Sequence, residues 1–178
     1  MRVVAGVVRG RRLVAPSGST VRPTTDRVKE SIFNALGSLD LLHDAQVVDL
    51  FAGSGALGIE ALSRGASHVT FVDNDRASIA VVRQNLAAVG LEAQATIRQA
   101  DAFAALATGV ATDALVVLAD PPYQFDRWDE LFAAIAAPWV VIEAGAPVVL
   151  PAGWINVRER AYGSTIVCFA HRDAPSAA

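Results

Sequence analysis

The stretch Asp49-Leu50-Phe51-Ala52-Gly53-Ser54-Gly55-Ala56-Leu57-Gly58 decides the fold of this 178-residue chain. Its glycines follow the pattern G-x-G-x-x-G directly after the apolar segment 46–50, which predicts a buried strand that turns into a helix. Glycines at such a turn let the backbone approach a ligand closely, and the helix N-terminus offers N–H donors. Asp73 ends the next apolar segment, where a carboxylate can accept both hydroxyls of a ribose. The stretch therefore predicts a nucleoside-binding strand–turn–helix unit.

Strand-like and helix-like segments alternate after this unit. We expect strands at 46–50, 69–72, 95–98, 114–119, 140–143 with 148–150, 155–160 and 165–170, and helices at 57–64, 75–89, 102–107 and 128–137. Repeated strand–helix units predict a parallel sheet covered on both faces, and Tyr162-Gly163-Ser164 predicts an antiparallel hairpin near the C-terminal end. The predicted fold class is α/β, a doubly wound and mostly parallel sheet.

A basic segment precedes this pattern. Arg9-Gly10 lies between the β-branched segment 2–8 and residues 11–14, which predicts a small hairpin. Thr25 is the expected N-cap of a helix that ends near Gly37. We therefore divide the chain into a basic β-hairpin extension (1–24), the α/β domain (25–172) and a short tail (173–178).

Composition excludes several classes of protein. Apolar residues make up 53% and charged residues 19%, enough to form a core without a disulfide or metal. Cys168 is the single cysteine and the three histidines are scattered, so we expect no metal site. No secretory signal opens the sequence, and prolines and Glu143 interrupt the apolar stretch 133–150, so we expect a cytoplasmic protein without a membrane span.

The net charge of −3 is unevenly distributed along the chain. Residues 1–30 carry seven basic side chains and two acidic ones, whereas the rest of the chain is acidic. A basic segment of this kind is typical of a protein that contacts a polyanion, although a solvated end, with Arg27 paired to Glu30, is the alternative. The expected nucleic-acid contacts are Arg9, Arg11, Arg12, Arg22, Arg27 and Lys29.

Asp49 distinguishes between two cofactors that suit a glycine turn. A carboxylate just before the glycines would repel the pyrophosphate of a nicotinamide dinucleotide, but it suits S-adenosylmethionine, which carries an amino group and no phosphate. Asp101 and Ala102, after the third strand, are placed to read an adenine edge, although Asp101 is equally suited to cap the next helix. The expected cofactor residues are Asp49, Phe51, Gly53, Gly55, Asp73, Asn74, Asp101 and Ala102.

The loop Asp120-Pro121-Pro122-Tyr123 follows the fourth strand, at the edge of the sheet where ligands bind in open α/β folds. An exocyclic amine is a poor nucleophile because its lone pair is delocalised. Hydrogen bonds from its two N–H groups to the Asp120 carboxylate and the Pro121 carbonyl would favour a pyramidal, more nucleophilic nitrogen. The prolines fix the backbone, and Tyr123 offers a ring on which a planar substrate can stack. A strand-end proline turn is the alternative.

The segments Asp49 to Gly55 and Asp120 to Tyr123 together resemble the amino-methyltransferases of the Rossmann class. Residues 22–34, 51–58 and 60–65 are similar to one branch, the bacterial small-subunit ribosomal RNA guanine-N2 methyltransferases of the RsmD family, and the resemblance covers about residues 1–170. Many members have Phe where this chain has Tyr123, and both rings can stack.

This resemblance implies a seven-stranded sheet that ends in an antiparallel hairpin, with S-adenosylmethionine as the methyl donor. It implies that the target is a guanine of small-subunit rRNA in an assembled or assembling subunit. Asp120, Pro121, Pro122 and Tyr123 would hold the guanine amine, and the N-terminal arginines would contact RNA. We expect a monomer.

Three alternatives remain open from the sequence. Asp120 is also compatible with an adenine-N6 methyltransferase of DNA or RNA, although this chain has no room for a separate target-recognition domain. Asp49 disfavours a nicotinamide-dependent reductase. A non-catalytic RNA-binding assembly factor would need neither the glycine turn nor the Asp-Pro-Pro-Tyr loop.

Overall fold

A computed structural model describes residues 1–16 and 25–173 of the chain, so Arg22 lies outside the described residues. Its sheet has seven strands in the order β3-β2-β1-β4-β5-β7-β6. The strands are β1 (Gln46–Leu50), β2 (His68–Asp73), β3 (Ala95–Gln99), β4 (Val116–Ala119), β5 (Trp139–Ala144), β6 (Trp154–Tyr162) and β7 (Thr165–Arg172). The first five pair in parallel, and β7 pairs antiparallel with both β5 and β6. The predicted fold class and its terminal hairpin are confirmed.

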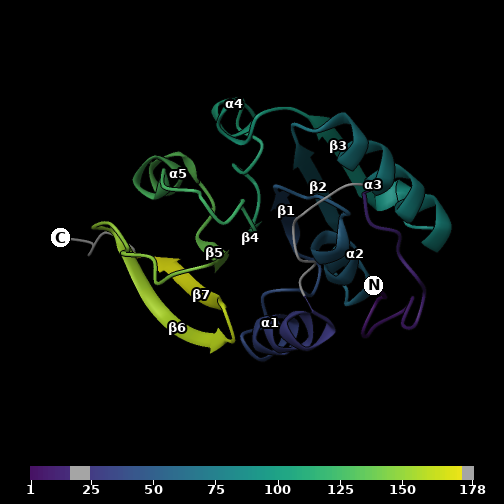
Figure 1. Cartoon of the computed structure of the whole chain (residues 1–178), viewed down its shortest axis with the longest axis horizontal. Coiled ribbons are helices and arrows are strands. Elements are labelled where there is room, and N and C mark those ends of the chain that lie inside the picture. The colour runs from purple at the N-terminus through teal and green to yellow at the C-terminus, as the bar shows by residue number, and fades with distance from the viewer. Residues whose placement is uncertain (17–24, 174–178) are drawn as a thin grey trace.

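Helices cover both faces of the sheet (Figure 1). They are α1 (Asp26–Ser38), α2 (Ala56–Ser63), α3 (Arg76–Val89), the short 3₁₀ helix η1 (Glu92–Gln94), α4 (Ala102–Ala107) and α5 (Trp128–Ala134). Successive strand residues point to opposite faces, so Val47 packs in the core beneath α1, α2 and α3, and Val48 packs in the core beneath α4 and α5. Thr25 caps α1 as predicted, with its side chain accepting from the N–H of Val28.

The N-terminal segment folds back on itself antiparallel, as predicted, in a short hairpin around the bridge Arg2–Arg12. The N–H of Val3 donates to the carbonyl of Arg11 at 3.0 Å, and the N–H of Leu13 donates to the carbonyl of Met1 at 3.1 Å. Other backbone donors of the segment are bonded to α2. The N–H groups of Val4 and Ala5 donate to the Glu60 carboxylate at 2.7 and 3.0 Å. The N–H of Val7 donates to the carbonyl of Ser63 at 2.8 Å. Residues 1–16 are therefore docked on the domain.

Two expected elements differ most from the structure, and the other bounds differ by at most two residues. Residues 148–150 form no strand, because β7 occupies the position beside β5 that such a strand would need. The last helix ends at Ala134 and not at residue 137, since Ile135 already has extended backbone. Within residues 1–16 and 25–173, no helix has both the length and the apolar character to span a membrane.

Candidate active site

The glycine turn between β1 and α2 has the tight geometry that its sequence predicts. Gly53 and Gly55 have φ of +54° and +76°, and Phe51 shares this left-handed region at +59°. The N–H of Gly53 donates to Asp73 Oδ2 at 2.7 Å. The turn and the end of β2 are thus directly connected.

Asp49 lies beneath this turn with only 1% of its surface exposed. Its Oδ2 accepts a hydrogen bond from the N–H of Gly58 at 2.9 Å. Burial raises the pKa of Asp49 well above its usual range, and the negative charges of Asp120 and Asp73 raise it further, against the effect of the Gly58 hydrogen bond. A cationic ligand group beside this carboxylate would stabilise its charged form.

The remaining expected cofactor residues lie at or just after the end of β2, which neighbours β1 in the sheet, and just after β3, the edge strand beyond β2. Asp73 Oδ1 accepts from the N–H of Asp75 at 2.8 Å, and Asn74 is exposed. Asp101 caps α4 through the N–H groups of Phe103 and Ala104, which is the second role that its sequence position allows. Its neighbour Ala102 is buried.

An aromatic cluster joins the glycine turn to the other helix layer. The ring of Phe51 contacts Phe125 edge-on at 5.6 Å between centroids, and Phe125 contacts both Phe103 and Trp128. Phe125 follows the Asp120–Tyr123 loop in sequence. The cluster therefore connects the expected cofactor residues with that loop, a relationship that the sequence did not indicate.

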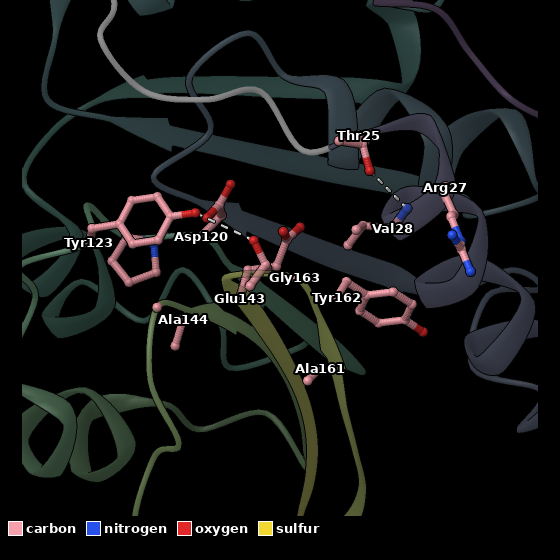
Figure 2. Close-up of a pocket in the computed structure, with 13 residues that line it drawn as sticks. Thr25, Arg27, Val28, Asp120, Tyr123, Glu143, Ala144, Ala161, Tyr162 and Gly163 are labelled. Atoms are coloured by element: carbon pink, nitrogen blue, oxygen red, sulfur yellow. Dashed lines mark hydrogen bonds between the residues drawn. The ribbon is translucent and has the colours of Figure 1, made fainter.

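A cavity of about 370 Å³ lies at the carboxyl ends of β4 and β5 (Figure 2). Three residues of the predicted loop line it, namely Asp120, Pro121 and Tyr123, whereas Pro122 is exposed and is not among the lining residues. The opposite wall comes from the start of α1 and from the β6–β7 hairpin. Its residues are Thr25, Arg27, Val28, Ala161, Tyr162, Gly163 and Thr165.

The Tyr123 ring forms one wall of this cavity and is 56% exposed. Gly145 makes room for it, because a Cβ atom at that position would lie 2.5 Å from Cδ1 of the ring. The Tyr123 hydroxyl lies 3.4 Å from Thr165 Oγ1. An exposed ring backed in this way can stack against a planar substrate.

Glu143 is a site residue that sequence reasoning missed. It lines the same cavity as Asp120, and its side chain is 4% exposed. Ala119 of β4 is paired with Ile142 of β5, so the next residues, Asp120 and Glu143, lie beside each other at the sheet edge. Figure 2 shows their side chains between Tyr123 and α1. A carboxylate in the otherwise apolar strand Trp139–Ala144 was the signal that could have found it.

The predicted RNA contacts are distributed over three places. Lys29 is wrong as an RNA contact, because it is 1% exposed, its Nζ donates to the carbonyl of Arg2, and it lies 3.6 Å from Glu60 Oε2. Arg11 donates to the carbonyl of Ala88 at 2.5 Å, at the C-terminal end of α3. Arg9 and Arg12 are exposed on the same N-terminal segment. Among the predicted RNA contacts within residues 1–16 and 25–173, only Arg27 lines the cavity.

Comparison with known proteins agrees with this architecture. The family described as "Conserved hypothetical protein 95" matches residues 1–171. The "Ribosomal RNA small subunit methyltransferase D" of Escherichia coli (strain K12) is 36% identical in an alignment that covers 98% of this chain and 91% of that protein.

Two solved structures are similar to this one. A putative methyltransferase, yhhF from Escherichia coli, has a TM-score of 0.84 at 36% identity and covers 98% of both chains. An RNA methyltransferase from Salinibacter ruber, in complex with S-adenosyl-L-homocysteine, shares the fold with a TM-score of 0.66 at 21% identity, over 88% of this chain and 98% of that one. With the match over residues 1–171 and the likeness to methyltransferase D, the chain belongs to the RsmD family of methyltransferases.

Proposed function

We propose that this protein transfers a methyl group from S-adenosylmethionine to the exocyclic N2 amine of a guanine in small-subunit ribosomal RNA. The single observation that carries the choice of guanine is the pair of neighbouring carboxyl groups, Asp120 and Glu143, in one cavity. Membership of a family whose named relatives include a small-subunit rRNA methyltransferase supports the choice of rRNA.

The residues at the glycine turn fit S-adenosylmethionine. Asp49 is a buried carboxyl group with a raised pKa, which suits a cation more than it suits a phosphate. Asp73 stands at the end of β2, where ribose hydroxyls are bound in this class of fold. S-adenosylmethionine would supply the methyl group as a sulfonium. The related fold from Salinibacter ruber, which was solved with S-adenosyl-L-homocysteine, supports the same donor.

We call the cavity lined by Asp120, Tyr123 and Glu143 the acceptor cavity, because it would hold the base that accepts the methyl group. Its hydrogen-bonding groups favour guanine over adenine. The Watson–Crick edge of guanine presents the N1–H and N2–H donors side by side, whereas adenine presents its amine beside an acceptor nitrogen. In our proposal Asp120 and the carbonyl of Pro121 accept from the N2 amine, and Glu143 accepts from N1–H. An adenine would place a lone pair against a buried carboxylate, at a cost in binding.

The chemistry requires orientation more than a strong base. Hydrogen bonds to Asp120 and Pro121 hold the amine so that its lone pair can attack the methyl carbon, as the carbon–sulfur bond breaks and the nitrogen–carbon bond forms. The methylated nitrogen is briefly a cation and hence a strong acid. Its surplus proton then passes readily to water, while the sulfur leaves as the neutral thioether, so Asp120 acts as an orienting acceptor.

The direct test is methyl transfer from labelled S-adenosylmethionine to small ribosomal subunits from a strain that lacks this protein, with naked rRNA and DNA alongside. Mass analysis of the labelled nucleoside should identify N2-methylguanosine. Label in methyladenine would show that the methylated base is adenine and not guanine. Retained binding of S-adenosylmethionine without any label in RNA or DNA would instead indicate a non-catalytic binding protein.

Two variants locate the reaction in the cavity. Asp120→Ala should abolish turnover while calorimetry still detects S-adenosylmethionine binding. Glu143→Gln should lower kcat/KM for the RNA by about tenfold to a hundredfold, because it removes a charge-assisted hydrogen bond. Glu92→Gln, on the exposed 3₁₀ helix η1, makes the same chemical change away from the site and should leave activity unchanged. Full activity of Asp120→Ala would overturn the assignment.

A further inference from the structure

A second groove, of about 440 Å³, lies between α1 and β6. It meets the acceptor cavity at Arg27, which lines both. Ser31 Oγ of the groove is hydrogen-bonded to the hydroxyl of Tyr162, a residue of the cavity wall. The lining residues are Arg27, Glu30, Ser31, Asn34, Ala35, Arg158 and Arg160. We call this feature the α1–β6 groove.

The pairing of β6 with β7 explains why two arginines face this groove. Arg158 is paired with Phe169, and Arg160 is paired with Val167. Both partners belong to the core on the α1 side of the sheet, and residues that are paired across strands point to the same face. Arg158 and Arg160 therefore lie on the side of the edge strand β6 that faces α1.

The arginines of the groove, Arg27, Arg158 and Arg160, form no ion pair with an acidic side chain among residues 1–16 and 25–173. Other arginines of the same face are paired, since Arg2 contacts Asp26 at 3.0 Å and Arg64 contacts Glu60 at 2.8 Å. Glu30 is the single acidic residue among those that line the groove. The groove therefore has a net positive charge.

We propose that the α1–β6 groove binds the phosphate backbone of the RNA strand next to the nucleotide that enters the acceptor cavity. This inference rests on the proposed function, because it takes RNA as the substrate. Guanidinium groups bind phosphate oxygens through paired N–H donors, and such contacts fix the register of a nucleic acid on a protein. Arginines on both α1 and β6 would hold the strand from two sides at the mouth of the cavity.

The N-terminal segment is the competing RNA surface, and its position is less favourable. It packs along α2 and α3, through Glu60, Ser63 and Asn85, and its Arg11 is bonded at the C-terminal end of α3. Figure 1 shows the segment on the far side of α1 and α2 from the β6–β7 hairpin. Most of the segment thus lies away from the β6–β7 wall of the cavity, although Arg2 reaches Asp26 at the start of α1. The groove adjoins the cavity directly through Arg27.

The test compares three double variants that each remove two positive charges. Arg158→Gln/Arg160→Gln alters the groove, Arg9→Gln/Arg12→Gln alters the N-terminal segment, and Arg83→Gln/Arg98→Gln is a matched control with exposed arginines on α3 and β3. Affinity for transcribed small-subunit rRNA is measured at several salt concentrations, together with S-adenosylmethionine binding and the unfolding temperature.

The groove variant should bind RNA about tenfold more weakly or worse. A plot of the logarithm of its association constant against the logarithm of the salt concentration should have a negative slope that is less steep by about 1.4, as for two lost phosphate contacts on a single strand. Its S-adenosylmethionine binding and unfolding temperature should equal those of the wild type. The control pair should bind RNA as the wild type does. Unchanged affinity and slope for the groove variant, or a larger loss for the N-terminal variant, would overturn the proposal.

The binding assay also separates this inference from the proposed function. If the wild-type protein methylates no guanine but binds rRNA in a salt-dependent manner through Arg158 and Arg160, the proposed reaction fails and the groove assignment holds. If it methylates guanine and the groove variant retains full affinity and rate, the reaction holds and the groove assignment fails.

Discussion

The buried carboxyl group of Asp49 accepts a hydrogen bond from the backbone N–H of Gly58, 2.9 Å away, and so connects the end of β1 to the first turn of α2. Gly58 supplies one polar partner, but burial still dominates and raises the pKa of Asp49. The site therefore carries a carboxyl group whose charged form is unfavourable in the absence of a ligand.

Asp49→Asn should raise the unfolding temperature at pH 8 without ligand. Because the folded-state pKa is raised, the folded state retains a proton that the unfolded chain releases. The stability that the protonated Asp49 carboxyl group contributes is fully present below the unfolded-state pKa and is lost as the pH rises through the raised folded-state pKa. Asn keeps an acceptor for the N–H of Gly58 and has no charge to bury. The difference in unfolding temperature between the variant and the wild type should therefore become smaller as the pH falls.

The same variant should bind S-adenosylmethionine more weakly, which isothermal calorimetry can measure. Scans of thermal unfolding from pH 5 to pH 8 would check the stability effect. An unfolding temperature at or below that of the wild type at pH 8 would contradict it.

Gly58→Ala should destabilise the protein by about 1–3 kcal/mol. A Cβ atom at this position would lie 2.3 Å from Cε1 of the Phe71 ring and 2.8 Å from Cγ1 of Val69, so α2 would have to move away from β2. Gly37→Ala is the control, because its Cβ meets no atom within 4 Å and alanine favours a helix by about 0.5–1 kcal/mol. Urea unfolding should give opposite signs for the two variants, and equal values would refute the packing argument.

Lys29→Met should cost about 1–3 kcal/mol of unfolding free energy, because the carbonyl of Arg2 and the buried Glu60 lose their contacts with Lys29, whereas Glu60 keeps Arg64. Arg127→Ala removes one partner of an exposed pair with Glu130 and should cost less, since solvent screens that pair. Chemical denaturation of both variants tests the difference. If Lys29→Met lowers the free energy of unfolding no more than Arg127→Ala does, the buried pair contributes no more to stability than the exposed pair.

Tyr123→Ala should lower kcat/KM for RNA by about fivefold to 150-fold, the range that the loss of one base-stacking ring produces. Tyr123→Phe keeps the ring and gives up only the long contact of 3.4 Å to Thr165, so it should retain most of the activity. Steady-state methylation of small subunits compares the two. If Phe were as damaging as Ala, the hydroxyl and not the ring would be the important group.

Elements with a local signal were predictable from the sequence. The strand Gln46–Leu50 and the helix Ala102–Ala107 have the bounds that their apolar patterns predict, and Thr25 caps α1 as predicted. These features depend on short-range rules for glycines, caps and alternating side chains. Such rules act between residues that are close in the chain.

The features that were missed depend on contacts between distant parts of the chain. Lys29 is buried because Glu60 comes to it from another helix, and its sequence neighbourhood is otherwise that of a basic surface. Glu143 becomes a site residue only when β5 is placed beside β4, and Arg158 and Arg160 become a groove only when β6 faces α1. The packing of α1 on α2 decides the first case and the order of strands decides the other two. For Glu143 the local pattern shows only a carboxylate in an otherwise apolar strand.

The strand β7 lies inside the sheet, between β5 and β6, although it is the last strand in the sequence. Synthesis from the N-terminus therefore produces the glycine turn, Asp49 and Asp73 long before Thr165, which contributes to the acceptor cavity. A nascent chain that ends before β7 would hold the residues proposed for the methyl donor while the acceptor cavity lacks part of its wall. Competence to modify a base would then arise only when the final hairpin has been synthesised and inserted, so that a chain interrupted before β7 could retain its donor site and yet be unable to act on RNA.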